Sequence, residues 1–166
     1  MDLARLNDLP ADEARQVFLD CCASAEWADH MTRHRPFAGE DDLLEAARVE
    51  WRALGQQDRE EAFAAHPRIG DEVAGNDRHS SWSRREQAAA ADASPTVQDR
   101  LAACNRAYQD SFDRVFLVFA TGRSAEEILA LCEERLGNDA ETEYRIASAE
   151  QEKITDLRLR RLLGIG

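Results

Sequence analysis

The stretch FDRVFLVFATG, residues 112–122, decides the fold class, because it is the only strongly β-like run in this chain of 166 residues. Its valines, phenylalanines and leucine favour an extended backbone. An isolated strand is not stable without a partner strand, and the sequence offers no second run of this kind. We therefore predict a buried, extended or distorted segment between helices, in an all-α helical bundle that forms a single domain over residues 1–166.

Helix signals flank this segment on both sides. Before it, Ser94 and Pro95 are residue types that favour an N-cap and a first helical position. After it, Ser124 and Glu127 form a capping-box pattern, and Gly-Asn-Asp at 137–139 ends that helix and begins a long final one. Apolar periodicity in the N-terminal part predicts three further helices, over residues 10–24, 25–33 and 41–54.

The region between these helices mixes capping patterns with polar residues. Residues 58–61 have the form of a capping box and predict a short helix that reaches His66. Residues 67–82 are polar and contain glycine, so we expect a loop, and loops of this length are often functional. Residues 83–86 repeat the capping-box pattern and predict an alanine-rich helix that begins there.

Charge and hydropathy exclude several classes of function. The formal net charge is −12 and the pI is near 4.8, whereas a nucleic-acid-binding protein needs a basic face to neutralise phosphates. No run approaches the roughly 20 apolar residues of a membrane span, and the N-terminus lacks the basic and apolar regions of a signal peptide. We expect a soluble, cytoplasmic protein that binds neither nucleic acid nor membrane.

The four cysteines, Cys21, Cys22, Cys104 and Cys132, form no CxxC pair and lie among apolar neighbours in predicted helices. We expect them to be reduced and buried, as in a cytosolic protein. A disulfide or a metal site is the alternative that these spacings leave open.

Two histidines share a spacing that suits a metal site, but their surroundings do not. His30 and His34 are four residues apart and would lie on one helix face. No glutamate follows His30 as in an HExxH motif, and Arg33 and Arg35 flank His34 with positive charge. We therefore predict no metal site there.

His66 is the first candidate for chemistry. Pro67 disfavours the α conformation in the residue before it, so the helix must stop at His66. One interpretation is a helix stop whose imidazole faces the last carbonyl groups. The other is an imidazole held at the mouth of a pocket, with Gly70 allowing the backbone to approach a ligand closely.

The final helix carries an arginine in its apolar stripe. With Ile154 at 0° and about 100° per residue, Arg158 lies at about 40° and Leu162 at about 80°. A buried charge needs a partner, and a guanidinium is suited to a carboxylate or a planar carbonyl group. A structural ion pair is the alternative, and Arg161 is a second candidate for the same role.

Glu86 and Gln87 complete the set of candidates. Taken alone, Glu86 is the third residue of a capping box and Gln87 is a surface residue of the same helix. Together with His66 and Arg158, they provide an imidazole, a carboxylate, a carboxamide and a guanidinium. This set suits proton transfer without a cofactor on a small, polar, anionic molecule.

Several motifs, in order along nearly the whole chain, resemble the OHCU decarboxylase family. They are RPF at 35–37, HPRIG at 66–70, WSRREQ at 82–87, GRSAEEIL at 122–129 and KITDLRLRRL at 153–162, together with Trp27 and Trp51. The resemblance implies an all-helical fold, often dimeric, with no cofactor. It also implies loss of CO₂ from 2-oxo-4-hydroxy-4-carboxy-5-ureidoimidazoline (OHCU), giving (S)-allantoin in uric acid breakdown. A hydroxyisourate hydrolase would then be a functional partner.

The same resemblance implies roles for individual residues. The histidine of the H-P motif corresponds to His66, the chief catalytic group, and the family's glutamate to Glu86. The residues that correspond to substrate-binding positions are Pro67, Ser83, Gln87, Phe116, Leu117, Val118 and Arg158. One departure is Asp113, where many members have glycine, which takes a positive φ more easily than aspartate. The competing interpretation is an acidic, all-α interaction module without catalytic activity.

Overall fold

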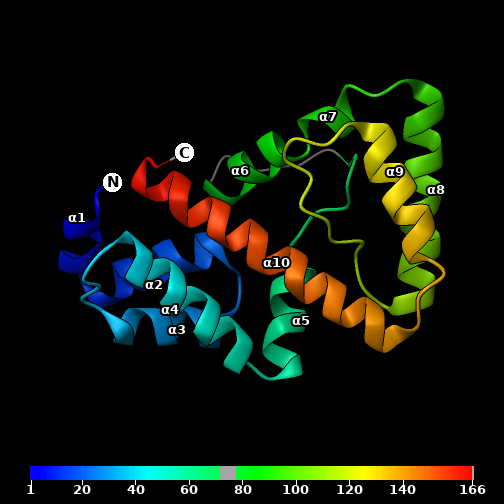
Figure 1. Ribbon diagram of the computed structural model, residues 1–166. Coiled ribbons are helices and arrows are strands. Elements are labelled where there is room, and N and C mark those ends of the chain that lie inside the picture. The colour runs from blue at the N-terminus through cyan, green and yellow to red at the C-terminus, as the bar shows by residue number, and fades with distance from the viewer. Residues whose placement is uncertain (72–77, 166) are drawn as a thin grey trace. The chain divides into compact units, whose positions relative to one another are not determined.

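The computed structural model describes residues 1–71 and 78–165, apart from the side chains of residues 79, 89 and 91. The described residues contain helices and no strand, so the all-α prediction is confirmed (Figure 1). The helices are α1 (Leu3–Asp8), α2 (Ala11–Cys21), α3 (Ala25–His34), α4 (Glu40–Ala53), α5 (Gln56–Ala64), α6 (Arg78–Glu86), α7 (Ala88–Ala91), α8 (Pro95–Phe112), α9 (Ala125–Arg135) and α10 (Ala140–Leu163). Within the described part, no helix combines the length and the hydropathy that crossing a membrane requires.

The chain divides into two compact units. Unit 1 comprises Met1–Ala62 and Glu152–Gly166, and unit 2 comprises Phe63–Gln151. The first half of α10 therefore belongs to unit 2 and its second half to unit 1.

Unit 1 is built on aromatic side chains of α2, α3 and α4. Trp27 is fully buried, packs edge to face on Phe18 at 5.9 Å between ring centroids, and donates its indole N–H to the Ala47 carbonyl at 3.0 Å. Ser24 is the N-cap of α3, because its hydroxyl accepts the N–H of Trp27 at 3.4 Å. The helix predicted to reach residue 24 therefore ends at Cys21, since Ser24 caps the next helix.

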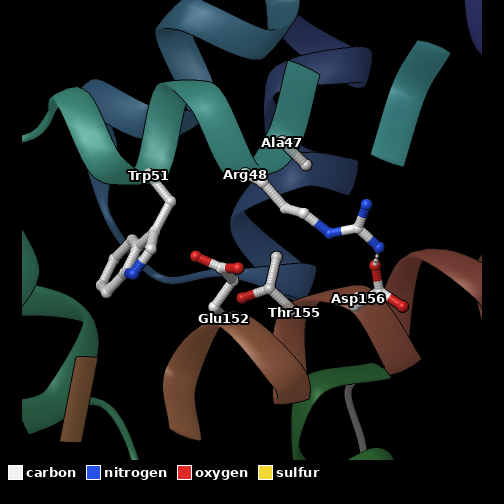
Figure 2. Close-up of a pocket in the computed structure, with 6 residues that line it drawn as sticks. All are labelled: Ala47, Arg48, Trp51, Glu152, Thr155 and Asp156. Atoms are coloured by element: carbon white, nitrogen blue, oxygen red, sulfur yellow. Dashed lines mark hydrogen bonds and ion pairs between the residues drawn. The ribbon is translucent and has the colours of Figure 1, made fainter. Parts of the chain in front are cut away.

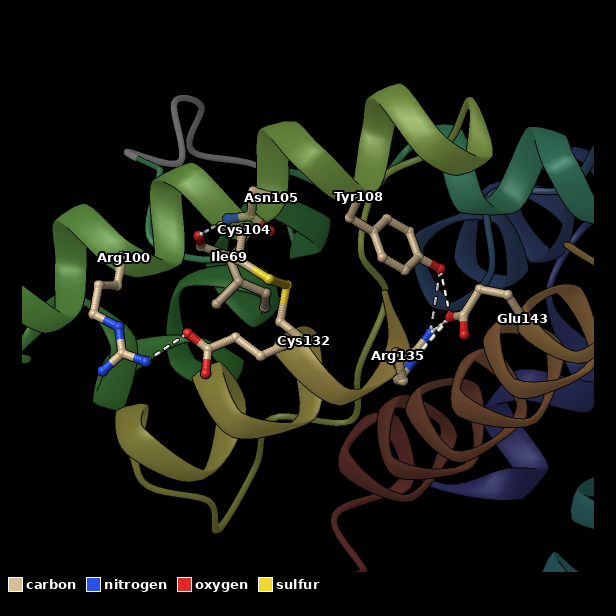
Figure 3. Close-up of a disulfide and its surroundings, with 9 residues drawn as sticks. Ile69, Arg100, Cys104, Asn105, Tyr108, Cys132, Arg135 and Glu143 are labelled. Carbon is tan, nitrogen blue, oxygen red and sulfur yellow. Dashed lines mark hydrogen bonds and ion pairs between the residues drawn. A yellow bond between two sulfur atoms is a disulfide. The ribbon is translucent and has the colours of Figure 1, made fainter. Parts of the chain in front are cut away.

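A disulfide in the core of unit 2 joins α8 to α9 (Figure 3). It links Cys104 and Cys132, whose Cα atoms are 6.3 Å apart, which is within the range that a disulfide spans. The prediction that all four cysteines are reduced is therefore wrong for this pair. The sequence did not show that these two helix faces pack together. Cys21 and Cys22 are buried, as expected.

The segment after α8 is extended and buried, as predicted. It turns out of the helix at Asp113, which has φ 53° and ψ 34° and is the one described non-glycine residue with positive φ. Phe116, Leu117 and Val118 follow with exposures of 2 to 4%. An aspartate thus occupies the left-handed conformation for which glycine is the usual residue.

Two predicted helix starts are wrong. α5 begins at Gln56, so Asp58 lies in its first turn, where a carboxylate interacts favourably with the helix dipole. α6 begins at Arg78, so residues 78–82 are helical and the loop is shorter than predicted, while residues 72–77 lie outside the described part.

The capping box predicted at 83–86 is also wrong, because Ser83 lies inside α6 and Glu86 ends it. Trp82, Ser83 and Glu86 are all buried, with exposures of 7, 1 and 9%. Burial of this face stabilises a helix that a serine-rich sequence disfavours locally.

Candidate active site

His66 lies just beyond the end of α5, where the His-Pro pattern predicted a helix stop. α5 ends at Ala64, and the N–H of His66 still bonds the Phe63 carbonyl at 3.2 Å. The imidazole is half-buried, and its Nε2 lies 2.8 Å from Oε1 of Gln151 in α10. The stop therefore places the imidazole against a polar side chain of unit 2.

Gln87 holds the turn that follows His66. Its carboxamide accepts the N–H of Gly70 at 3.3 Å and donates to the carbonyl of Pro67 at 3.5 Å. Gly70 has φ +88°, so its position in this turn requires glycine. The carboxamide expected to bind substrate thus contacts the backbone of the His-Pro loop, a contact that no pattern in the sequence indicates.

Helix α8 holds the same loop from another side. Asn105, only 3% exposed, donates its amide to the Ile69 carbonyl at 2.8 Å (Figure 3). Arg68 donates Nε to Oε1 of Gln109 at 3.0 Å. Sequence reasoning assigned no role to these residues, although an asparagine within an apolar helix face was a usable signal.

Two buried side chains hold the extended segment through hydrogen bonds with its backbone. The Leu117 carbonyl accepts Nη1 of Arg135 at 2.7 Å, and the Phe119 N–H donates to Glu150 at 2.6 Å. Because both groups that hold it are buried side chains, the path of residues 117–119 is set by unit 2 itself.

Arg135 is itself fixed by a buried polar network, of which Figure 3 shows Arg135, Glu143 and Tyr108. Its guanidinium bonds Glu143, which also accepts the Tyr108 hydroxyl at 2.5 Å and the Asn138 amide at 2.9 Å. Burial alone would raise the pKa of Glu143, but hydrogen bonds from Arg135, Asn138 and Tyr108 hold that pKa below its usual value. Burial and the hydrogen bond to Glu143 raise the pKa of Tyr108. The pair is therefore a carboxylate with a neutral phenol.

Arg158 occupies the place that the helical wheel predicted. It is 0% exposed and lies on α10 between the buried Ile154 and Leu162. It belongs to unit 1, where its charge acts on the thiol of Cys22. Burial raises the pKa of this thiol to about 12, and a hydrogen bond with Thr155, one with the Ser24 backbone and the charge of Arg158 oppose this rise more weakly.

Two pockets of unit 1 do not fit the predicted chemistry. Figure 2 shows the first, which lies between α4 and the second half of α10 beside the 2.6 Å ion pair of Arg48 with Asp156. Its volume of about 10 Å³ is close to the minimum for one water molecule. The second is an open pocket of about 340 Å³ at His30 and His34.

The two histidines of the open pocket contact carboxylates of glutamates in the same chain. Both ring nitrogens of His30 lie 2.8 Å from carboxylate oxygens, one of Glu26 and one of Glu50, and His34 lies 3.6 Å from Glu50. Among the described residues, no three side chains of metal-ligand type are grouped so that they could hold a metal ion.

In unit 2 the structure therefore brings His66, Pro67 and Gln87 together. Ser83 and Glu86 are buried on α6, and Phe116, Leu117 and Val118 are buried in the extended segment of the same unit. Gln151, Asn105 and Glu150 are the polar residues that sequence reasoning missed.

Comparison with known proteins gives consistent matches. The profile of the OHCU decarboxylase family matches residues 7–160. The Uric acid degradation bifunctional protein TTL of Arabidopsis thaliana is 34% identical over 146 residues, which are 86% of this chain and 45% of that protein. The 2-oxo-4-hydroxy-4-carboxy-5-ureidoimidazoline decarboxylase of Amia calva is 30% identical, over 98% of this chain and 95% of that protein.

A solved structure agrees with these sequence matches. The crystal structure of OHCU decarboxylase in the presence of (S)-allantoin superposes with a TM-score of 0.78 at 32% identity, covering 89% of this chain and 96% of that one. By contrast, the chain spans less than half the length of the Arabidopsis relative.

Proposed function

The chain belongs to the OHCU decarboxylase family, and on this premise we propose that it decarboxylates OHCU to (S)-allantoin without a cofactor, in the degradation of uric acid. The observation that carries the proposal is the family match over residues 7–160, which includes residues of both units. It is supported by the likeness to an OHCU decarboxylase crystallised in the presence of (S)-allantoin.

We assign His66 as the chief catalytic group. Loss of CO₂ breaks the bond between the carboxyl carbon and the ring, and the adjacent C=N group of the ring takes up the remaining electron pair. The ring must then be protonated on one face to give a single enantiomer. Histidine suits proton transfer at this step, because its unperturbed pKa lies near neutrality. Its half-buried place beside Gln151 supports the assignment.

Glu86 is proposed to act at the departing carboxylate. If ionised, it repels the substrate carboxylate as CO₂ forms, and if protonated, it donates a hydrogen bond to it. A Glu86→Gln variant separates the two roles, since the amide retains a hydrogen-bond donor and loses the negative charge.

The remaining residues carried over from the resemblance are proposed to bind substrate. Arg158 would bind a carboxylate or ureido group and backbone groups of 116–118 would bind a ring or ureido carbonyl. The buried guanidinium of Arg158 and the fixed path of 117–119 support these roles. Pro67, Ser83 and Gln87 are likewise proposed to bind substrate.

We further propose a cytoplasmic homodimer that works beside a hydroxyisourate hydrolase. The hydrolase is the class of enzyme that would supply OHCU. Support for this coupling comes from the relatives of Arabidopsis and a Bacillus strain, each named a uric acid degradation bifunctional protein.

The test is a chiral assay. Urate is oxidised in the presence of the upstream hydrolase, with and without this protein, and the optical activity of the allantoin is followed. Rapid appearance of (S)-allantoin only when the protein is present supports the decarboxylase. Unchanged, racemic product favours the alternative of an acidic interaction module.

A further inference from the structure

The hydrogen bond between His66 and Gln151 lies in the candidate site, and no role predicted from the sequence involves it. Nε2 of His66 and Oε1 of Gln151 are 2.8 Å apart, although 85 residues separate them in the chain. Gln151 is 0% exposed and lies on α10, two residues before the first residue of the KITDLRLRRL motif. Both residues belong to unit 2.

This contact has a consequence for the position of a proton. A neutral imidazole carries one N–H, and its other nitrogen carries a lone pair. An amide oxygen only accepts hydrogen bonds, so a bond at Oε1 requires the proton on Nε2. Because Gln151 is buried, breaking this bond removes a hydrogen bond from the interior, which is costly. The bond therefore favours one tautomer of His66.

We propose that Gln151 is a positioning residue that holds neutral His66 in the Nε2–H tautomer, so that Nδ1 is the nitrogen that accepts a proton from the substrate. This inference rests on the proposed function. Once CO₂ has left and the ring nitrogen has taken up the electron pair of the C=N group and a proton from water, the hydroxyl proton would move to Nδ1. The electron pair of the O–H bond would become the second bond of the product carbonyl, and the C=C pair released in this way would bind the proton at the ring carbon. The proton returns to the ring when allantoin forms, and the imidazole is neutral again.

Glu150, the neighbour of Gln151 on α10, holds the extended segment. Glu150 accepts the N–H of Phe119 at 2.6 Å, and Gln151 contacts His66. Successive helix residues point about 100° apart, so these two side chains reach different elements from one turn. This turn of α10 thus fixes both the imidazole and the extended segment.

The direct test reads the tautomer in the free protein. Long-range ¹H–¹⁵N spectra of ¹⁵N-histidine-labelled protein show which ring nitrogen is protonated, and the His66→Asn variant identifies the signals of His66. We expect the Nε2–H form in the unchanged protein and a mixture of both tautomers in Gln151→Leu. The Nδ1–H form in the unchanged protein, or an unaltered spectrum in Gln151→Leu, would overturn the inference.

A charged variant gives a second readout that a purely structural role would not move. In Gln151→Glu a carboxylate faces the imidazolium and stabilises it, so the pKa of His66 rises. We expect the acid limb of the kcat/KM profile, and the NMR titration of His66, to move to higher pH by roughly one unit. If His66 titrates at the same pH in Gln151→Glu and in the unchanged protein, the role of Gln151 is contradicted.

Gln109→Leu is the matched control. It removes a glutamine that bonds Arg68 in the same loop but does not contact the imidazole, so the tautomer of His66 should stay as it is. Loss of the Nε2–H form in this control would show that the loop, and not Gln151, selects the tautomer.

Because the spectra need no substrate, the two proposals fail separately. The expected spectrum without (S)-allantoin formation would overturn the proposed function, whereas the wrong tautomer in an active protein overturns the role of Gln151.

Discussion

Reducing the disulfide between α8 and α9 should destabilise unit 2 by a calculable amount. The bond joins Cys104 and Cys132, which are 28 residues apart in the chain, and it lies in the core of this unit. In the chain-entropy account, a cross-link stabilises a protein by restricting its unfolded state, and the effect grows with the loop it closes. The relevant comparison is between oxidised and reduced chains of the same sequence.

The size of the effect follows from the loop length. A closed loop of 28 residues gives a stabilisation of about 3.5 kcal/mol at 25 °C. With an unfolding entropy of about 2.1 cal/mol/K per residue, a chain of this length would lose roughly 10 °C of Tm on reduction.

The assay is equilibrium unfolding in urea, followed by circular dichroism, with and without a phosphine reductant. The reductant reaches the buried bond through the unfolded chain. Cys104→Ala/Cys132→Ala is the control, because its unfolding curve should not respond to reductant. If the two units unfold in separate steps, the shift should fall on the step of unit 2.

Two results would refute this reasoning. The first is coincident unfolding curves with and without reductant. The second is a count of four free thiols, in place of two, in protein denatured without reductant. Counting the thiols of protein alkylated at the moment of lysis also tests the proposed cytoplasmic location. Because disulfides are uncommon in the cytosol, four thiols at that moment would favour this location.

Substitutions at two positions, a pH series and an alkylation experiment test other parts of the structure. Asp113→Val should lower the free energy of unfolding by about 1–2 kcal/mol, because a β-branched residue is strained at positive φ, whereas Asp113→Gly should not lower it in the same urea titration. Glu143→Gln should cost about 3–5 kcal/mol, because it leaves the buried Arg135 without its carboxylate. The folded pKa of Glu143 lies below its unfolded value, so its stabilisation is complete above the unfolded pKa and is lost as pH falls through the folded pKa, which a pH series of thermal melts would show. Cys22, whose pKa is raised to about 12, should resist iodoacetamide in the folded protein at pH 8, and mass spectrometry showing rapid alkylation would contradict its burial.

Local patterns predicted much of the helical framework. The caps at Ser94 and Ser124 act over three residues and need no distant partner, so they could be read directly and both are confirmed. The non-helical path of residues 115–120, within the run predicted at 112–122, followed from the lack of a partner strand for a lone β-like run. The burial of Arg158 followed from helical geometry alone.

What the sequence could not show depends on packing between distant segments. α6 begins at Arg78 because a face that includes Trp82 is buried, although its serines indicate a loop. The disulfide requires two helix faces to meet, and the bond from Gln151 to His66 joins residues 85 apart. Gln87 was expected to meet substrate, but whether its amide also contacts the chain could be learned only from the folded loop.

The central claim is that His66 makes this chain an (S)-selective OHCU decarboxylase. The most direct measurement is the optical activity of allantoin formed from OHCU in the presence of the unchanged protein and of His66→Asn, with circular dichroism confirming that the variant keeps its helices. We predict (S)-allantoin with the unchanged protein and only the slow, racemic product of spontaneous decay with His66→Asn. Continued formation of (S)-allantoin by a folded His66→Asn protein would contradict the account.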